Sequence, residues 1–195
     1  MATAPEYAAP AETPFTAGPD RRTGVRSYAV PFIVAVTGHR DLVPAEIPII
    51  RSRVRDCLFS LRYEYPSRII VVMSSLADGA DRLVAEEALK LGMPLSVVLP
   101  MPRALYEQDF TAESSREFAK FCDAASELFE LPLLPGRSPR SIVEPGPGRT
   151  RQYAQLGVFL SAHCHVLLAL WDGKSSDLLG GTAATIQFHH HDVMP

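Results

Sequence analysis

The sequence predicts an α/β fold in which helices cover both faces of a mostly parallel sheet. Two observations lead to this class. Short runs that are apolar throughout recur along the chain, and segments with apolar residues at helical spacing separate them. Strands without a polar side are typical of a parallel sheet buried between two layers of helices. A chain of 195 residues is long enough for one such domain.

Five apolar runs are expected as strands, and turn or helix signals bound each of them. They are Phe32–Val36, Arg68–Met73, Pro94–Leu99, Leu131–Leu134 and His165–Trp171. Pro66 ends the segment before the second run, and Pro100 ends the third run because a proline cannot donate to the hydrogen-bond ladder.

Helices are expected between these runs, over 44–65, 81–91, 111–128 and 149–162, and from 182 onward. Gly92 stands just past the end of the second helix, and Thr111 is a good N-cap for the third. Residues 135–148 are rich in Pro and Gly and predict a long loop of the kind that is usually functional or mobile.

The domain organisation follows from composition. Residues 1–26 are rich in Ala, Pro, Thr and Gly without apolar periodicity, which predicts a disordered leader, and 27–195 are expected to form one domain. The last helix leaves little room for a closing strand before Pro195. We therefore expect that the domain is trimmed from a longer protein with a C-terminal effector region.

The net charge and the hydropathy of the chain limit the classes of binding partner that are expected. The net charge is -3 and no block of Lys or Arg stands out, so no nucleic acid partner is expected. The apolar runs are far shorter than the ~20 residues that span a bilayer, so no membrane contact is expected. The N-terminus lacks the apolar h-region of a signal peptide, and Cys57, Cys122 and Cys164 are widely spaced, which predicts free thiols in the cytoplasm.

Polar loops that follow apolar runs hold the candidate ligand-binding residues, because parallel sheets bind ligands beyond the carboxyl ends of their strands. In the first loop, Gly38 lets the backbone pass close to a ligand, and Arg40 could pair with a phosphate. His39 could donate a hydrogen bond or act as an acid or base. The alternative is a solvated polar loop without a ligand.

The second loop joins the second run to a helix. Its small residues, among them Ser75 and Gly79, leave backbone N–H groups at a helix N-terminus, where an anion can bind. Asp78 or Asp81 either caps this helix or holds the hydroxyl groups of a ribose.

Two further segments are candidates. The residues Gly180, Gly181 and Thr182 either cradle a phosphate at a helix start or form a plain turn with an N-cap. Trp171 either stacks on a base or closes the core. Arg149 and Arg151 begin the helix after the Pro/Gly loop, where they either reach phosphates or are solvated.

Several standard motifs are absent from the sequence. It has no GxxxxGK[ST], no GxGxxG after the first strand and no GxSxG elbow, which excludes P-loop, standard dinucleotide and α/β-hydrolase signatures. His189–His191 do not match an HExxH site. No metal site and no cofactor are therefore expected.

An ordered set of motifs carries a family resemblance. It consists of Val36–Arg40 (VTGHR), Ala77–Leu83 (ADGADRL), Leu168–Gly173 (LALWDG) and Gly180–Ala183 (GGTA). In this order the motifs resemble the SLOG superfamily, which includes the lonely-guy phosphoribohydrolases, the DNA-processing protein of natural transformation and the sensing domain of melastatin-type channels. The match is to a bacterial branch with GxR and GAD motifs.

The resemblance implies a Rossmann-like three-layer sandwich with a mostly parallel sheet of five or six strands. It also implies a nucleotide pocket, lined by Gly38, Arg40, Gly79, Asp81, Gly180, Gly181 and Thr182. The hydrolase branch carries PGGxGTxxE, in which the Glu assists cleavage of the N-glycosidic bond. Thr185 stands in the place of that Glu.

The leading hypothesis is therefore a sensor domain for a nucleotide-like small molecule that regulates an attached effector and forms homo-oligomers. One alternative is hydrolysis of a nucleoside 5′-monophosphate at its glycosidic bond. His39, Asp78 or Asp81 would then replace the missing Glu. The second alternative is an oligomeric scaffold with a vestigial pocket.

Overall fold

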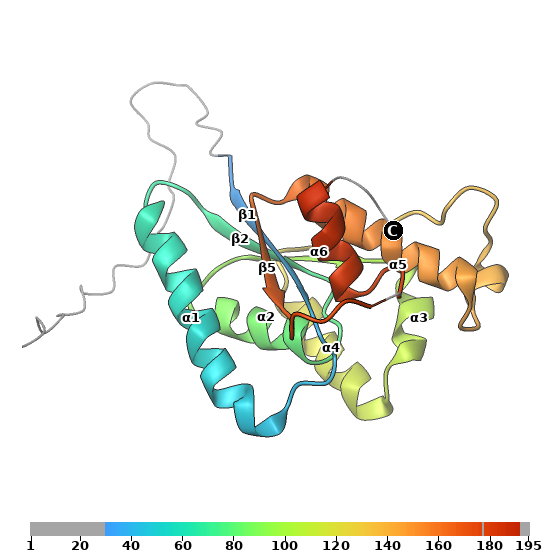
Figure 1. Cartoon of the computed structure of the whole chain (residues 1–195), viewed down its shortest axis with the longest axis horizontal. Coiled ribbons are helices and arrows are strands. Elements are labelled where there is room, and N and C mark those ends of the chain that lie inside the picture. The colour runs from blue at the N-terminus through green and yellow to red at the C-terminus, as the bar shows by residue number, and fades with distance from the viewer. Residues whose placement is uncertain (1–29, 177, 192–195) are drawn as a thin grey trace, which may run out of the picture.

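A computed structural model describes residues 30–176 and 178–191 and contains one sheet of five parallel strands (Figure 1). The strands are β1 (Phe32–Gly38), β2 (Ile70–Ser74), β3 (Leu95–Leu99), β4 (Glu127–Glu130) and β5 (Val166–Leu170). Their order across the sheet is β4-β3-β2-β1-β5, and each neighbouring pair is parallel. The predicted fold class is confirmed.

Helices cover the two faces of this sheet and complete the three layers (Figure 1). The larger helices are α1 (Ile47–Glu64), α2 (Ala80–Lys90), α4 (Ala112–Ala124), α5 (Pro147–His163) and α6 (Thr182–His191). The shorter ones are η1 (Pro44–Glu46), α3 (Arg103–Tyr106), η2 (Glu107–Asp109) and η3 (Pro139–Ile142). Thr111 caps α4 as predicted, because its side chain accepts a hydrogen bond from the Ser114 amide at 3.2 Å.

Two hydrophobic cores lie on opposite faces of the sheet. Successive side chains of a strand point to opposite faces, so Val34 and Val36 join the core beneath α1, α2 and α4, whereas Ala35 joins the core beneath α5. The first core is the larger, and Phe118 of α4 and Tyr106 of α3 are fully buried in it. The cores fix the strands, and hence the loops that follow them.

The fourth strand is not where the sequence predicts it. The expected strand Leu131–Leu134 is wrong: β4 is Glu127–Glu130, and the helix before it ends at Ala124 instead of 128. As an edge strand, β4 has no second neighbour among the described residues, and its two apolar residues, Leu128 and Phe129, stand between two glutamates. Its two glutamates accept hydrogen bonds, Glu127 from the Ser96 hydroxyl at 2.7 Å and Glu130 from the Arg103 amide at 2.8 Å.

The opposite edge, β5, is aliphatic along its whole length and yet only partly buried. Among the described residues it pairs with β1 alone. The predicted leader, residues 1–26, lies outside the described residues, as does Pro195. In the described part of the chain no helix is long and apolar enough to cross a membrane.

A buried carboxylate joins α1 to α2. Glu87 of α2 has no exposed surface, and it accepts hydrogen bonds from Arg51 at 2.7 Å, Arg55 at 2.8 Å and Lys90 at 3.1 Å. Burial alone would raise the pKa of Glu87, but these three cations outweigh it and lower the pKa to about 2. The folded state therefore favours the ionised carboxyl.

We predict that Glu87→Gln lowers the free energy of unfolding by roughly 2–3 kcal/mol at pH 7, since it removes the charge between three cations. The wild-type advantage should be constant above the ordinary glutamate pKa of 4.5 and should shrink as pH falls from 4.5 towards 2, because the wild-type carboxyl then becomes protonated. Urea denaturation between pH 7 and pH 3 measures this. The control Glu86→Gln, at a half-exposed neighbour, should cost less than ~1 kcal/mol.

Candidate functional site

The topology places a cavity at the expected position. The strand order reverses between β1 and β5, and ligands of open α/β sheets bind outside the carboxyl ends of the strands at such a point. A cavity of about 400 Å³ lies there, between the loops after β1 and β2, the start of α6 and one side of α5. Its lining comes from the end of β1, from the loops after β1, β2 and β5, and from α2, α3, α5 and α6.

Close backbone packing fixes the loops around this cavity. A side chain at Gly79 would collide with the backbone of His39 and Arg40, and one at Gly38 would collide with Ala80. The Ala80 amide donates to the His39 carbonyl at 3.0 Å, and the His39 amide donates to the Leu170 carbonyl at 3.1 Å. The carboxyl ends of β1, β2 and β5 are thereby held together.

The N-terminus of α6 opens on the cavity through Gly180, Gly181 and Thr182. Gly180 has a positive φ of 84°, and a Cβ atom there would lie 2.7 Å from the Ala154 amide nitrogen of α5. Only glycine fits this position, and it brings the first turn of α6 against α5. The positive end of the helix dipole and the free amides of that turn favour an anion in the cavity.

Arg40 reaches the cavity from the loop after β1. Its guanidinium carbon lies 5.9 Å from the centre of the Tyr153 ring, and its Nη2 is 4.0 Å from an Asp109 oxygen. Burial lowers the pKa of Arg40, but the neighbouring Tyr106, Tyr153 and Asp109 outweigh this and raise it. The guanidinium thus keeps a fixed positive charge beside the cavity.

Asp109 is the centre of the network behind Arg40. It accepts hydrogen bonds from the Tyr153 hydroxyl and from Arg149, the latter at 2.8 Å. Burial and the contact with Asp109 raise the pKa of Tyr153 to about 12. Arg149 is almost fully buried and donates to the Ile142 and Leu105 carbonyls, so it neither reaches the cavity nor is solvated.

Asp81 lies at the floor of the cavity with almost no exposed surface. Its Oδ2 accepts hydrogen bonds from the Ser74 hydroxyl at 3.1 Å and the Ser75 hydroxyl at 2.8 Å. Burial raises the pKa of Asp81, although these hydroxyl groups act in the opposite direction. The carboxyl group thus organises the loop after β2.

Asp78 and Gly79 do not line this cavity. Asp78 turns towards α4, where it accepts a hydrogen bond from Ser114 at 2.6 Å and pairs with Arg82 at 2.8 Å. Gly79 serves the backbone contact with the loop after β1. The other predicted site residues line the cavity together: Gly38, His39, Arg40, Ser75, Asp81, Trp171, Gly180, Gly181 and Thr182.

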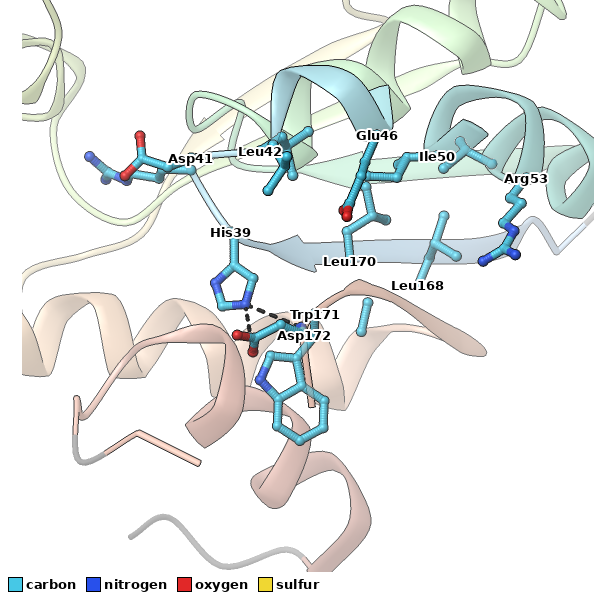
Figure 2. A pocket seen from close by; sticks show the side chains of 14 residues that line it. His39, Asp41, Leu42, Glu46, Ile50, Arg53, Leu168, Leu170, Trp171 and Asp172 are labelled. Atoms are coloured by element: carbon cyan, nitrogen blue, oxygen red, sulfur yellow. Dashed lines mark hydrogen bonds and ion pairs between the residues drawn. The ribbon is translucent and has the colours of Figure 1, made fainter. Parts of the chain in front are cut away.

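His39 separates this cavity from a second groove of about 620 Å³ between β5 and the start of α1 (Figure 2). The His39 Nε2 lies 3.2 Å from an Asp172 oxygen and 3.3 Å from the Asp172 amide nitrogen. Lys174, with a smaller contribution from His39, lowers the pKa of Asp172. Trp171 lines both spaces, is 39% exposed, and donates to the Lys174 carbonyl at 2.9 Å, so it does not close the core.

The cavity lining also includes Tyr106, Tyr153, Gly157 and Thr185, which the sequence does not predict as ligand-binding residues. The sequence pattern indicates Tyr153 only as an apolar position of its helix. Tyr106 ends the short helix α3, which no apolar periodicity indicates. Among residues 30–176 and 178–191, no group of three His, Cys, Asp or Glu side chains is placed to hold a metal ion.

Comparisons with known proteins support the fold. No family model and no curated protein matches the sequence. The X-ray structure of DNA processing protein A (DprA) from Streptococcus pneumoniae is similar, with a TM-score of 0.54 and 15% sequence identity. The match covers 83% of this chain and 48% of that chain. The chain thus has the Rossmann-like fold of DprA and spans about half the length of that protein.

The contact between α5 and α6 gives a direct test of the cavity wall. A Cβ atom at Gly157 would lie 2.6 Å from the Thr185 Oγ1, which itself donates to the Gly181 carbonyl at 3.1 Å. We predict that Gly157→Ala lowers the free energy of unfolding by ~1–2 kcal/mol through overpacking. In an unobstructed helix interior the same change would stabilise by ~1 kcal/mol.

Chemical denaturation of a double-mutant cycle checks this contact. Adding Thr185→Ala should recover ~1 kcal/mol of the loss, because it makes room for the new methyl group. The control Gly148→Ala, where the new Cβ would meet ordinary contacts at 3.4 Å, should not destabilise. Additive effects at Gly157 and Thr185 would contradict the predicted contact.

Proposed function

We propose that this chain is a nucleotide-binding sensor domain of the bacterial SLOG branch that its motifs resemble. The observation that carries the proposal is the convergence of anion-binding groups on one cavity. The first turn of α6 approaches from one side and Arg40 from another. The phosphate oxygens of a bound nucleotide would accept hydrogen bonds from the free amides and from the guanidinium.

The size and charge of the cavity agree with a small nucleotide. Its volume of about 400 Å³ falls within the range of small-molecule sites, ~300–1,000 Å³. Asp81 is the one acidic residue among the described residues that line it, and its Oδ2 is occupied by two serine hydroxyls. Trp171 offers an exposed ring beside the cavity on which a base would stack.

Binding is favoured over hydrolysis of the glycosidic bond. Thr185 stands where the hydrolases have a glutamate, and its hydroxyl is bonded to the Gly181 carbonyl. A hydrolytic route would have to use His39 or Asp81, because Asp78 faces α4. DprA is named for DNA processing, but the net charge of -3 here does not favour a nucleic acid over a small nucleotide.

We predict that a nucleotide raises the melting temperature and that Arg40→Ala or Thr182→Ala abolishes the shift. A ligand at a hundred times its dissociation constant stabilises the folded state by ~2.7 kcal/mol. The measurement is a thermal-shift screen with AMP, ADP, ADP-ribose, NAD, cyclic nucleotides and a single-stranded oligonucleotide. Arg116→Ala is the matched control, since that arginine is exposed on α4 and does not line the cavity.

The outcomes separate the alternatives. If no nucleotide raises the melting temperature, the sensor hypothesis is wrong and an oligomeric scaffold is favoured. A shift with the oligonucleotide alone would favour a DNA-binding role. Release of a free base from AMP, detected by chromatography and lost in Asp81→Asn with binding retained, would favour the hydrolase.

A further inference from the structure

The Tyr106 hydroxyl is a buried donor that the fold does not use. Tyr106 has no exposed surface and lines the cavity, and within the described residues its hydroxyl makes no hydrogen bond of good geometry, although the Ser75 hydroxyl, which itself donates to Asp81, lies beside it. Nine-tenths or more of buried polar groups in folded proteins have one. An orphan hydroxyl at the wall of a cavity therefore points to a ligand atom that accepts its proton.

The ring of Tyr106 is held without help from its hydroxyl. It makes edge contacts with Phe110 at 4.9 Å and Phe118 at 5.8 Å between ring centres, and its amide donates to the Pro102 carbonyl at 3.1 Å. Burial raises the pKa of Tyr106 far above its usual value, so the phenol stays protonated at neutral pH. It is thus a positioned donor.

Tyr153 brings this donor close to both anion-binding groups. Its ring centre lies 6.2 Å from that of Tyr106 and 5.9 Å from the Arg40 guanidinium carbon. On the other side, Gly180 packs so tightly that a Cβ atom there would lie 2.9 Å from the Tyr153 Cβ. The α6 N-terminus and the pair Arg40 and Tyr106 therefore flank one aromatic side chain.

We propose that Tyr106 and Arg40 form a second anion subsite, so that the ligand carries two phosphate groups, as in a nucleoside diphosphate or a nucleotide joined through a diphosphate. This rests on the proposed function. One phosphate binds the first turn of α6. The other accepts a hydrogen bond from the Tyr106 hydroxyl and pairs with Arg40. The Tyr106 hydroxyl then determines specificity for the second phosphate and contributes little to the stability of the fold.

Calorimetric titration with AMP and ADP, and with GMP and GDP, tests this in the wild type, Tyr106→Phe and the control Tyr65→Phe. Tyr65 is 40% exposed and stacks on Phe32, outside the cavity. The wild type should bind the diphosphate at least tenfold tighter than the monophosphate. Tyr106→Phe should weaken the diphosphate about tenfold and leave the monophosphate unchanged. Its melting temperature without ligand should stay the same or rise.

Three results would overturn the second subsite while the proposed function stands: equal affinity for mono- and diphosphate, wild-type affinity of Tyr106→Phe for the diphosphate, or equal weakening of both nucleotides. A lower melting temperature of free Tyr106→Phe would assign the hydroxyl to the fold instead. No binding of any of the four nucleotides would overturn the proposed function, and the subsite with it.

Discussion

The contact between the loops that follow β1 and β2 determines where the candidate ligand-binding groups lie. Gly79 presses its Cα against the backbone of His39 and Arg40, and Gly38 lies against Ala80 in the same way. These contacts leave no room for a Cβ atom at either glycine. Arg40 therefore leaves the sheet in one direction, towards α5, while α2 begins directly behind it. If these loops packed less closely, the side chain of Arg40 would no longer be held beside the cavity.

Asp109 completes the arrangement from an element distant in sequence. It binds Arg149 and Tyr153 and lies near Arg40, so one carboxylate connects η2, α5 and the loop after β1. Because the carboxylate sits behind the tyrosine ring, the cavity itself faces donors and a positive charge. Asp81 acts similarly on the loop after β2 through two serine hydroxyls. Both acids thus organise the groups around the cavity.

The sequence predicts the parts of the fold that local pattern controls. The three strands β1, β2 and β3 are apolar because helices bury both their faces, and the predicted runs overlap them. The edge strand β4 has only two apolar residues, which stand between Glu127 and Glu130, so the same criterion fails there. The loop residues of the cavity could be predicted because the apolar strands that precede them could be recognised in the sequence. Tyr106 and Tyr153 could not be predicted as site residues, since their place at the site depends on how distant elements pack around Asp109.

The two edge strands of the sheet differ in chemistry, so an additional strand would pair more favourably with one edge than with the other. The β4 border carries Glu127 and Glu130, whose charges discourage a further strand. The β5 border is wholly aliphatic and lies beside the open groove in Figure 2, where Leu168 and Leu170 remain only partly covered. An additional strand beside β5 would bury these aliphatic side chains further. Self-association through an exposed sheet edge would therefore begin at β5. The substitution Ala169→Lys would place a charge on this edge and discourage association in concentrated samples.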